Sequence, residues 1–265
     1  MAGPTTAERQ QRKSGPPRPQ RMRMRRPRLP RSRTLIIVLV LVVLLGAGAV
    51  WALYGSQWLR LERVKTSGTR VLTPEEVREA ADAPVGAPLI SVDTDALEDR
   101  LRSKLPRIDS VDVVRSWPHA IGLKVTERKP VLLIEKGGKF VEVDAKGVRF
   151  ATVGRAPRGV PRLEMRVDRE SAAASLRRFG TDRLLREAVR VAGDLPEAVA
   201  RDTRNVKVRS YDSISLELKG GRTVDWGSGE KGRSKATTLT ALMKAAPKAR
   251  HFDVSVPTAP ASSGS

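Results

Sequence analysis

The sequence has 265 residues, of which 50 are Lys or Arg and 29 are Asp or Glu, so its formal net charge is +21. It contains no cysteine and two histidines, which excludes disulfides, thiolate metal sites and cysteine nucleophiles and makes a multi-histidine metal site improbable. Apolar residues make up 40% of the chain and aromatic residues 4%, enough for the cores of one or two modest domains rather than one large enzyme.

The first 54 residues divide into a basic arm and an apolar stretch. Residues 1–34 hold ten Arg, one Lys, one Glu and six Pro, a composition that cannot fold by itself and predicts a disordered tail. Residues 35–54 carry no charge and, at about 1.5 Å per residue in a helix, would span a hydrocarbon core about 30 Å thick. This stretch predicts a single transmembrane helix.

The basic residues around this stretch also predict its orientation. Eight Lys or Arg lie in the twenty residues before it and four in the twenty after it, which favours a cytoplasmic amino terminus and an extracytoplasmic remainder. The alternative is a secreted or transport-associated protein whose signal peptide is cleaved after Ala49, because Ala47-Gly48-Ala49 has the required small residues. Retention is favoured, since the leader is long and the apolar stretch continues to Tyr54.

The basic arm has a sufficient explanation in the membrane. Each basic residue near a bilayer gains about 1 kcal/mol from acidic lipids, so adhesion needs no specific partner. No aromatic residue interleaves the arginines as a stacking platform, so a specific nucleic-acid partner is not expected.

Residues 55–129 predict a small α+β domain. Strand-like segments at 61–66, 111–117 and 121–127 enclose two helices. The first helix follows the capping box of Thr73 and Glu76, and the second spans 94–104 after the cap Asp93. Helices on one face of a sheet are the expected arrangement.

Residues 130–257 predict an antiparallel β domain with flanking helices, because Pro130 ends one sheet and alternating apolar segments follow it. Residues 258–265 are expected to be a disordered end. The predicted strands are 131–135, 139–144, 148–151, 206–211, 213–219, 223–226 and 252–256, and the predicted helices are 182–192 and 234–246.

One motif suggests an enzyme. Residues 227–234 read Gly-Ser-Gly-Glu-Lys-Gly-Arg-Ser, which has the spacing of a phosphate-binding loop. Arg233 stands where such a loop needs lysine, however, and no parallel βαβ unit follows. His119 and His251 lie in no catalytic motif. We therefore predict a protein without enzymatic activity, cofactor, metal or small-molecule substrate.

Several motifs in order carry a resemblance to a known family. They are Leu105-Pro106-Arg107-Ile108, Val111-Asp112-Val113, Arg115-Ser116-Trp117-Pro118, Val125-Thr126-Glu127-Arg128-Lys129-Pro130 and the segment 139–148. Together they resemble the FtsQ/DivIB family of bacterial cell-division proteins, in which such motifs close a POTRA domain just outside the membrane. The resemblance covers residues 35 to about 257 and is weak across 151–200.

The resemblance implies a division scaffold at the septum. In that family the last strand of the β domain and the helix before it receive FtsB or DivIC, themselves bound to FtsL, and the assembly regulates the synthases FtsW and FtsI. Carried over, the partner-binding residues are Lys248, Arg250, Phe252, Asp253, Val254, Ser255 and Val256. This requires the last strand to be an exposed sheet edge; the alternative is a covered strand that only closes the fold. The POTRA domain is either a second docking module or a spacer.

Overall fold

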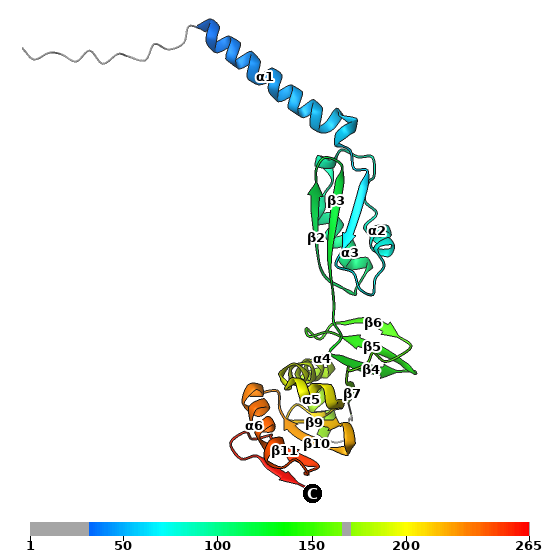
Figure 1. Ribbon diagram of the computed structural model, residues 1–265, viewed down its shortest axis with the longest axis vertical. Coiled ribbons are helices and arrows are strands. Elements are labelled where there is room, and N and C mark those ends of the chain that lie inside the picture. The colour runs from blue at the N-terminus through cyan, green and yellow to red at the C-terminus, as the bar shows by residue number, and fades with distance from the viewer. Residues whose placement is uncertain (1–31, 166–170, 265) are drawn as a thin grey trace, which may run out of the picture. The chain divides into compact units, whose positions relative to one another are not determined.

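The computed structural model describes residues 32–165 and 171–264 (Figure 1). The chain divides into two compact units, residues 1–51 and residues 52–265. The sequence predicts a disordered basic arm at 1–34. Residues 1–31 of this arm lie outside the described residues.

Helix α1 spans Ser32–Gly55 and contains the whole predicted membrane segment. Its most apolar window has a mean hydropathy of 2.9, and none of its residues is buried within the protein. Its 24 residues give a length of about 36 Å, enough to cross a hydrocarbon core. The helix is therefore long and apolar enough for a single membrane crossing.

The first sheet has three strands and two covering helices (Figure 1). Its strand order is β1 (Arg63–Ser67), β3 (Ala120–Glu127), β2 (Ile108–Ser116), with β1 parallel and β2 antiparallel to β3. Helices α2 (Pro74–Ala81) and α3 (Thr94–Lys104) pack on it and share one apolar core with its strands. The short helical turns η1 (Gln57–Leu59) and η2 (Leu89–Ser91) complete this part.

Both helices begin where the sequence predicts. The Thr73 side chain accepts the Glu76 N–H while the Glu76 carboxylate accepts the Thr73 N–H, which completes the capping box. Asp93 accepts the Ala96 N–H at the start of α3. Leu97 and Leu101, one helical turn apart, are both buried.

The second sheet has nine strands in the order β12-β11-β10-β9-β8-β7-β4-β5-β6. The strands are β4 (Leu132–Lys136), β5 (Lys139–Val143), β6 (Arg149–Val153), β7 (Arg162–Met165), β8 (Thr203–Ser210), β9 (Ser213–Leu218), β10 (Thr223–Gly227), β11 (His251–Asp253) and β12 (Ala261–Ser263). Its helices are α4 (Ser171–Asp194), α5 (Glu197–Asp202) and α6 (Gly232–Ala245), with a helical turn η3 (Lys219–Gly221).

Most neighbouring strands in this sheet are antiparallel, but three pairs are parallel. The parallel pairs are β4 with β7, β7 with β8 and β10 with β11. Parallel neighbours need a crossover, and α4 with α5 supplies it between β7 and β8, while α6 supplies it between β10 and β11. Leu184, Leu185, Ala188 and Val189 of α4 are buried against the sheet, on the face that the sequence predicts.

Three elements of the second sheet region differ from the sequence expectation. Strand β7 and the start of helix α5 lie within the segment 152–200, where the sequence predicts one helix and no strand. The end 258–265 is expected to be disordered, but its residues Ala261–Ser263 form β12 and pair with β11. The prediction fails there because backbone pairing, rather than an apolar pattern, holds β12 in the sheet.

The end of β3 is tied to the loop that follows β1. The Glu127 carboxylate accepts the N–H groups of Arg70, Val71 and Leu72 at 2.7, 3.0 and 3.0 Å. Partial burial opposes ionisation of this carboxyl group, but the three N–H donors outweigh burial and hold the Glu127 pKa below its usual value. The ionised form therefore stabilises the fold.

Gly68, in the same loop, is required by a close backbone approach. A Cβ at this position would lie 2.1 Å from the Val125 carbonyl oxygen. We expect Gly68→Ala to lower the free energy of unfolding by about 2 kcal/mol more than Gly86→Ala. Gly86 is the matched control because its φ of +90° resembles the +86° of Gly68 while its Cβ would meet nothing within 4 Å. Equal losses in urea unfolding would contradict the assignment.

Glu127→Gln tests the carboxylate. Because the folded-state pKa is lowered, the stabilisation is present above the unfolded pKa of Glu and is lost as pH falls through the folded value. We expect the variant to be about 1–2 kcal/mol less stable than the parent at pH 7 and the difference to shrink in acid. Urea unfolding between pH 7 and pH 3 measures it, with the exposed Glu62→Gln as control. A pH-independent difference would contradict the prediction.

Candidate partner-docking edge

The predicted docking segment lies next to the edge of the second sheet, not at it. Strand β11 pairs in parallel with β10 and in antiparallel with β12, so both of its sides are occupied. The expectation that the strand at 252–256 is an exposed edge is therefore wrong for this chain. The observed strand β11, His251–Asp253, is also shorter than the predicted strand 252–256, and β12 is the strand at the edge.

The seven predicted contact residues fall into two groups. Phe252 and Val254 are fully buried in the core of the second sheet, so their side chains hold the strand and cannot touch a partner. The side chains of the other five are at least partly accessible: Lys248, Arg250, Asp253, Ser255 and Val256. Of these, Lys248 and Arg250 supply exposed positive charge directly before β11.

The polar side chains around β11 are organised by local hydrogen bonds. Asp253 accepts the Ser255 N–H at 2.9 Å and ends the strand. The side-chain and backbone hydrogen bonds from Ser255 hold the Asp253 pKa below its usual value, so this carboxylate is negative at neutral pH. His251 Nδ1 lies 2.9 Å from Thr223 Oγ1, and its Nε2 lies 3.5 Å from an Asp225 carboxylate oxygen.

Lys235, in α6, holds the end of β10 and the loop that follows it. Its side chain is buried, and Nζ donates to the carbonyl oxygens of Trp226 and Ser228, both at 2.8 Å. Burial lowers the Lys235 pKa. These bonds fix the loop after β10, where a Cβ on Gly227 would lie 3.0 Å from Ser255 Cβ. Lys235 is thus a positioning residue for the chain that leaves β11, a role that the sequence does not reveal.

The glycine-rich loop 227–234 is a packing element rather than a phosphate cradle. A Cβ on Gly229 would lie 2.3 Å from Glu187 Oε2, and one on Gly232 would lie 1.9 Å from Asp194 Oδ2. Two carboxylates of α4 therefore occupy the space at the start of α6 that an anionic phosphate would need. The glycines are explained by this close approach.

The described residues offer no cluster with obvious metal chemistry. Within 32–165 and 171–264, no group of three or more His, Cys, Asp or Glu side chains is placed to hold a metal ion. His119 stands between β2 and β3, where its carbonyl oxygen accepts the Glu62 N–H. His251 is part of the sheet.

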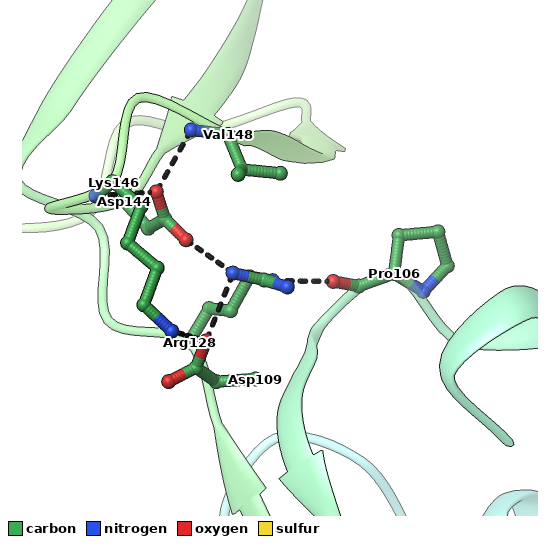
Figure 2. Close-up of polar contacts among 6 residues, drawn as sticks. All are labelled: Pro106, Asp109, Arg128, Asp144, Lys146 and Val148. Atoms are coloured by element: carbon green, nitrogen blue, oxygen red, sulfur yellow. Dashed lines mark hydrogen bonds and ion pairs between the residues drawn. The ribbon is translucent and has the colours of Figure 1, made fainter. Parts of the chain in front are cut away.

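A second polar site joins the two sheets. Figure 2 shows Arg128 between two carboxylates, with Nη1 donating to Asp109 Oδ1 at 3.0 Å and to Asp144 Oδ2, while its Nε donates to the Pro106 carbonyl. Lys146 Nζ lies 2.6 Å from Asp109 Oδ1. The hydrogen bond from Lys146 holds the Asp109 pKa below its usual value despite partial burial.

The Arg128–Asp144 pair is the buried part of this junction site, whereas Lys146 is exposed. The Arg128 and Asp144 side chains are 16% and 6% exposed. Asp144 Oδ1 also accepts the N–H groups of Lys146 and Val148 at 2.9 and 2.8 Å. Beside it, Arg107 Nη2 lies 2.6 Å from Glu142 Oε2. The motif Glu127-Arg128-Lys129-Pro130 thus supplies bonds to both sheets; the sequence predicts that one sheet ends and another begins there, but not these bonds.

Comparison with known proteins gives a consistent set of relatives. Residues 59–128 match the family described as POTRA domain, FtsQ-type. The chain is 71% identical to the cell division protein FtsQ of Streptomyces collinus over the whole of both chains. It is 71% identical to FtsQ of Streptomyces venezuelae over 84% of this chain and 81% of that protein. For FtsQ of Mycolicibacterium smegmatis the identity is 33%, over 78% and 58%.

A solved structure is also similar, at a low level. The major extracytoplasmic domain of the cell division protein DivIB from Geobacillus stearothermophilus aligns with 45% of this chain and 94% of its own, with 17% identity and a TM-score of 0.31. The family of the chain is shown by the FtsQ proteins of Streptomyces. Their identity over the full length shows that the chain belongs to the FtsQ family of bacterial cell division proteins.

Proposed function

We propose that this protein is a non-enzymatic scaffold of the division machinery. In this proposal α1 stays in the cell membrane with the basic arm in the cytoplasm, and the two sheets lie outside at the division septum. The β11–β12 end of the second sheet docks an FtsB/DivIC-like protein together with an FtsL-like protein, and so regulates the FtsW and FtsI synthases. Full-length identity to FtsQ proteins is the observation that carries the proposal.

The geometry of the β11–β12 end supports docking there. Backbone groups at the end of a sheet can pair with an extended segment, and β11 and β12 are the last two strands of a nine-stranded sheet. Lys248 and Arg250 are exposed beside it and would attract acidic side chains of a partner. In this proposal the first domain spans 55–129 and the docking domain spans 130–257. The hydrogen bonds of Arg128 connect the two sheets.

The alternative, a secreted POTRA protein cleaved after Ala49, is not favoured. We expect mass spectrometry of the membrane-extracted protein to find a mature amino terminus before Leu35. We also expect protease added to intact spheroplasts to digest the folded part and spare the arm, because bilayer and cytoplasm shield it. A product that begins at Val50, or digestion of the arm alone, would contradict this topology.

Charge reversal tests the docking surface. We expect Lys248→Glu combined with Arg250→Glu to reduce capture of the FtsB/DivIC-like protein from crosslinked dividing cells about tenfold, since each reversed charge repels acidic partner groups. The matched control is Lys136→Glu with Lys139→Glu, which changes net charge equally at exposed positions of the β4–β5 hairpin, in the same sheet but away from β11, β12 and α6. Equal capture by both double variants would remove Lys248 and Arg250 from the proposal. Val254 is unsuitable for such a test because it is buried.

A further inference from the structure

Strand β12 is held on the edge of β11 by backbone hydrogen bonds, and none of its side chains is buried. We propose that β11 is an exchangeable docking edge: residues 261–263 occupy it in the free chain, and an extended segment of a partner replaces them. The inference rests on the proposed docking function and adds how docking occurs. The partner strand pairs with β11 directly, rather than adding to the outer side of β12.

The hydrogen bonds of β11 show which of its residues face β12. The Thr223 N–H donates to the Arg250 carbonyl at 2.8 Å, and the Val254 N–H donates to the Asp225 carbonyl at 2.9 Å. Since alternate residues of a strand face opposite neighbours, the backbone groups of Phe252 also face β10. The backbone groups of His251 and Asp253 therefore face Ser263 and Ala261 of β12.

The side chains of β12 add little to this pairing. Ala261, Ser262 and Ser263 are all exposed, so the strand buries no large apolar side chain. By contrast Phe252, opposite Ser262, is fully buried and anchors β11. At about 25 cal/mol per Å² of apolar surface buried, a leucine or valine in place of Ser262 would hold the strand better. Backbone hydrogen bonds therefore hold β12, among them those that the Arg250 N–H donates to the Ser263 and Gly264 carbonyls at 3.1 and 2.7 Å, and the short tether through 254–260 keeps the strand close to β11.

The outer side of β12 is a poor site for strand addition. Because Ala261 and Ser263 turn their backbone groups toward β11, only Ser262 turns an N–H and a carbonyl outward within the strand. The residue before the strand is Pro260, which has no N–H to donate. A partner strand that displaces β12 instead gains the groups of His251 and Asp253 and the flanking positive charge of Lys248 and Arg250.

These features define the partner segment by its chemistry. It is extended and antiparallel to β11, as β12 is. It carries an apolar residue opposite Phe252 and acidic residues within reach of Lys248 and Arg250. A fluorescent peptide of this chain's own residues 257–265 carrying Ser262→Leu serves as the probe. It supplies the antiparallel strand and the apolar residue opposite Phe252, without the acidic residues.

Two proline variants of the full chain separate exchange from outer addition. Ser263→Pro removes an N–H that faces β11 and so releases β12. We expect this variant to bind the probe about tenfold more tightly than the parent chain. A tenfold gain corresponds to a parent in which β12 covers β11 about nine-tenths of the time. Ser262→Pro removes only the outward N–H, so we expect parent-like binding. Loss of binding in Ser262→Pro with no change in Ser263→Pro would overturn the inference, as would absence of binding to Ser263→Pro.

An engineered disulfide can fix β12 on β11 reversibly. No other cysteine can compete for the bond, because the chain has none. His251 and Ser263 are register partners, and paired residues in an antiparallel ladder have Cα atoms about 5.5 Å apart, within disulfide range. We expect the oxidised His251→Cys/Ser263→Cys chain to lose probe binding and dithiothreitol to restore it, with each single variant unaffected. Equal binding by the oxidised and reduced forms would overturn the exchange.

The same disulfide separates this inference from the proposed function. If the parent chain captures no division partner from crosslinked cells, the docking function fails whatever the peptide does. If the partner is captured equally by the oxidised and reduced forms, docking stands and exchange at β11 is overturned. Capture by the reduced form alone supports both.

Discussion

The parallel pairing of β11 with β10 is the interaction on which the carboxyl-terminal end of the protein depends. Helix α6 returns the chain to the sheet, and Phe252 and Val254 are then buried in the same core as Trp226 and Leu239. Hydrogen bonds from Thr223 and Val254 set the register at both ends of the strand. Without that register, neither the placement of Lys248 and Arg250 nor the pairing of β12 would exist.

Local signals explain which parts of the fold the sequence predicts well. The capping box at Thr73, the cap at Asp93 and the buried leucines of α3 are short-range features, and all appear where expected. The apolar alternation of β8, β9 and β10 is equally clear because these strands each bury one face. For such elements, neighbouring residues alone determine the structure.

The elements that the sequence does not reveal are held by distant partners. Strand β7 has four residues and lies between β4 and β8, each in parallel pairing. Strand β12 has three small, exposed residues, and it is a strand because its backbone pairs with β11. The same limit applies to the candidate site: positive charge at Lys248 and Arg250 can be predicted, whereas burial of Val254 and coverage of β11 depend on contacts between remote segments.

The glycine-rich loop illustrates why spacing alone misleads. Its motif is close to that of a phosphate loop, yet the carboxylates of Glu187 and Asp194 come from a helix far away in sequence. Positions 229 and 232 therefore require glycine for reasons of space. Lys235, one helical turn into α6, has its amino group taken up by two carbonyl oxygens and is not available to an anion.

Glu127 and Arg128 are adjacent, yet Glu127 bonds only within the first sheet region, while Arg128 bonds to both sheet regions. Glu127 reaches back to the N–H groups of 70–72, and Arg128 reaches forward to Asp144 (Figure 2). The chain that connects the two sheets is thus held at a single peptide linkage by the charge-assisted hydrogen bonds of Glu127 and by the ion pairs of Arg128. Separating the two sheets would therefore require breaking the Arg128 ion pair with Asp144 as well as the neighbouring Arg107 ion pair with Glu142.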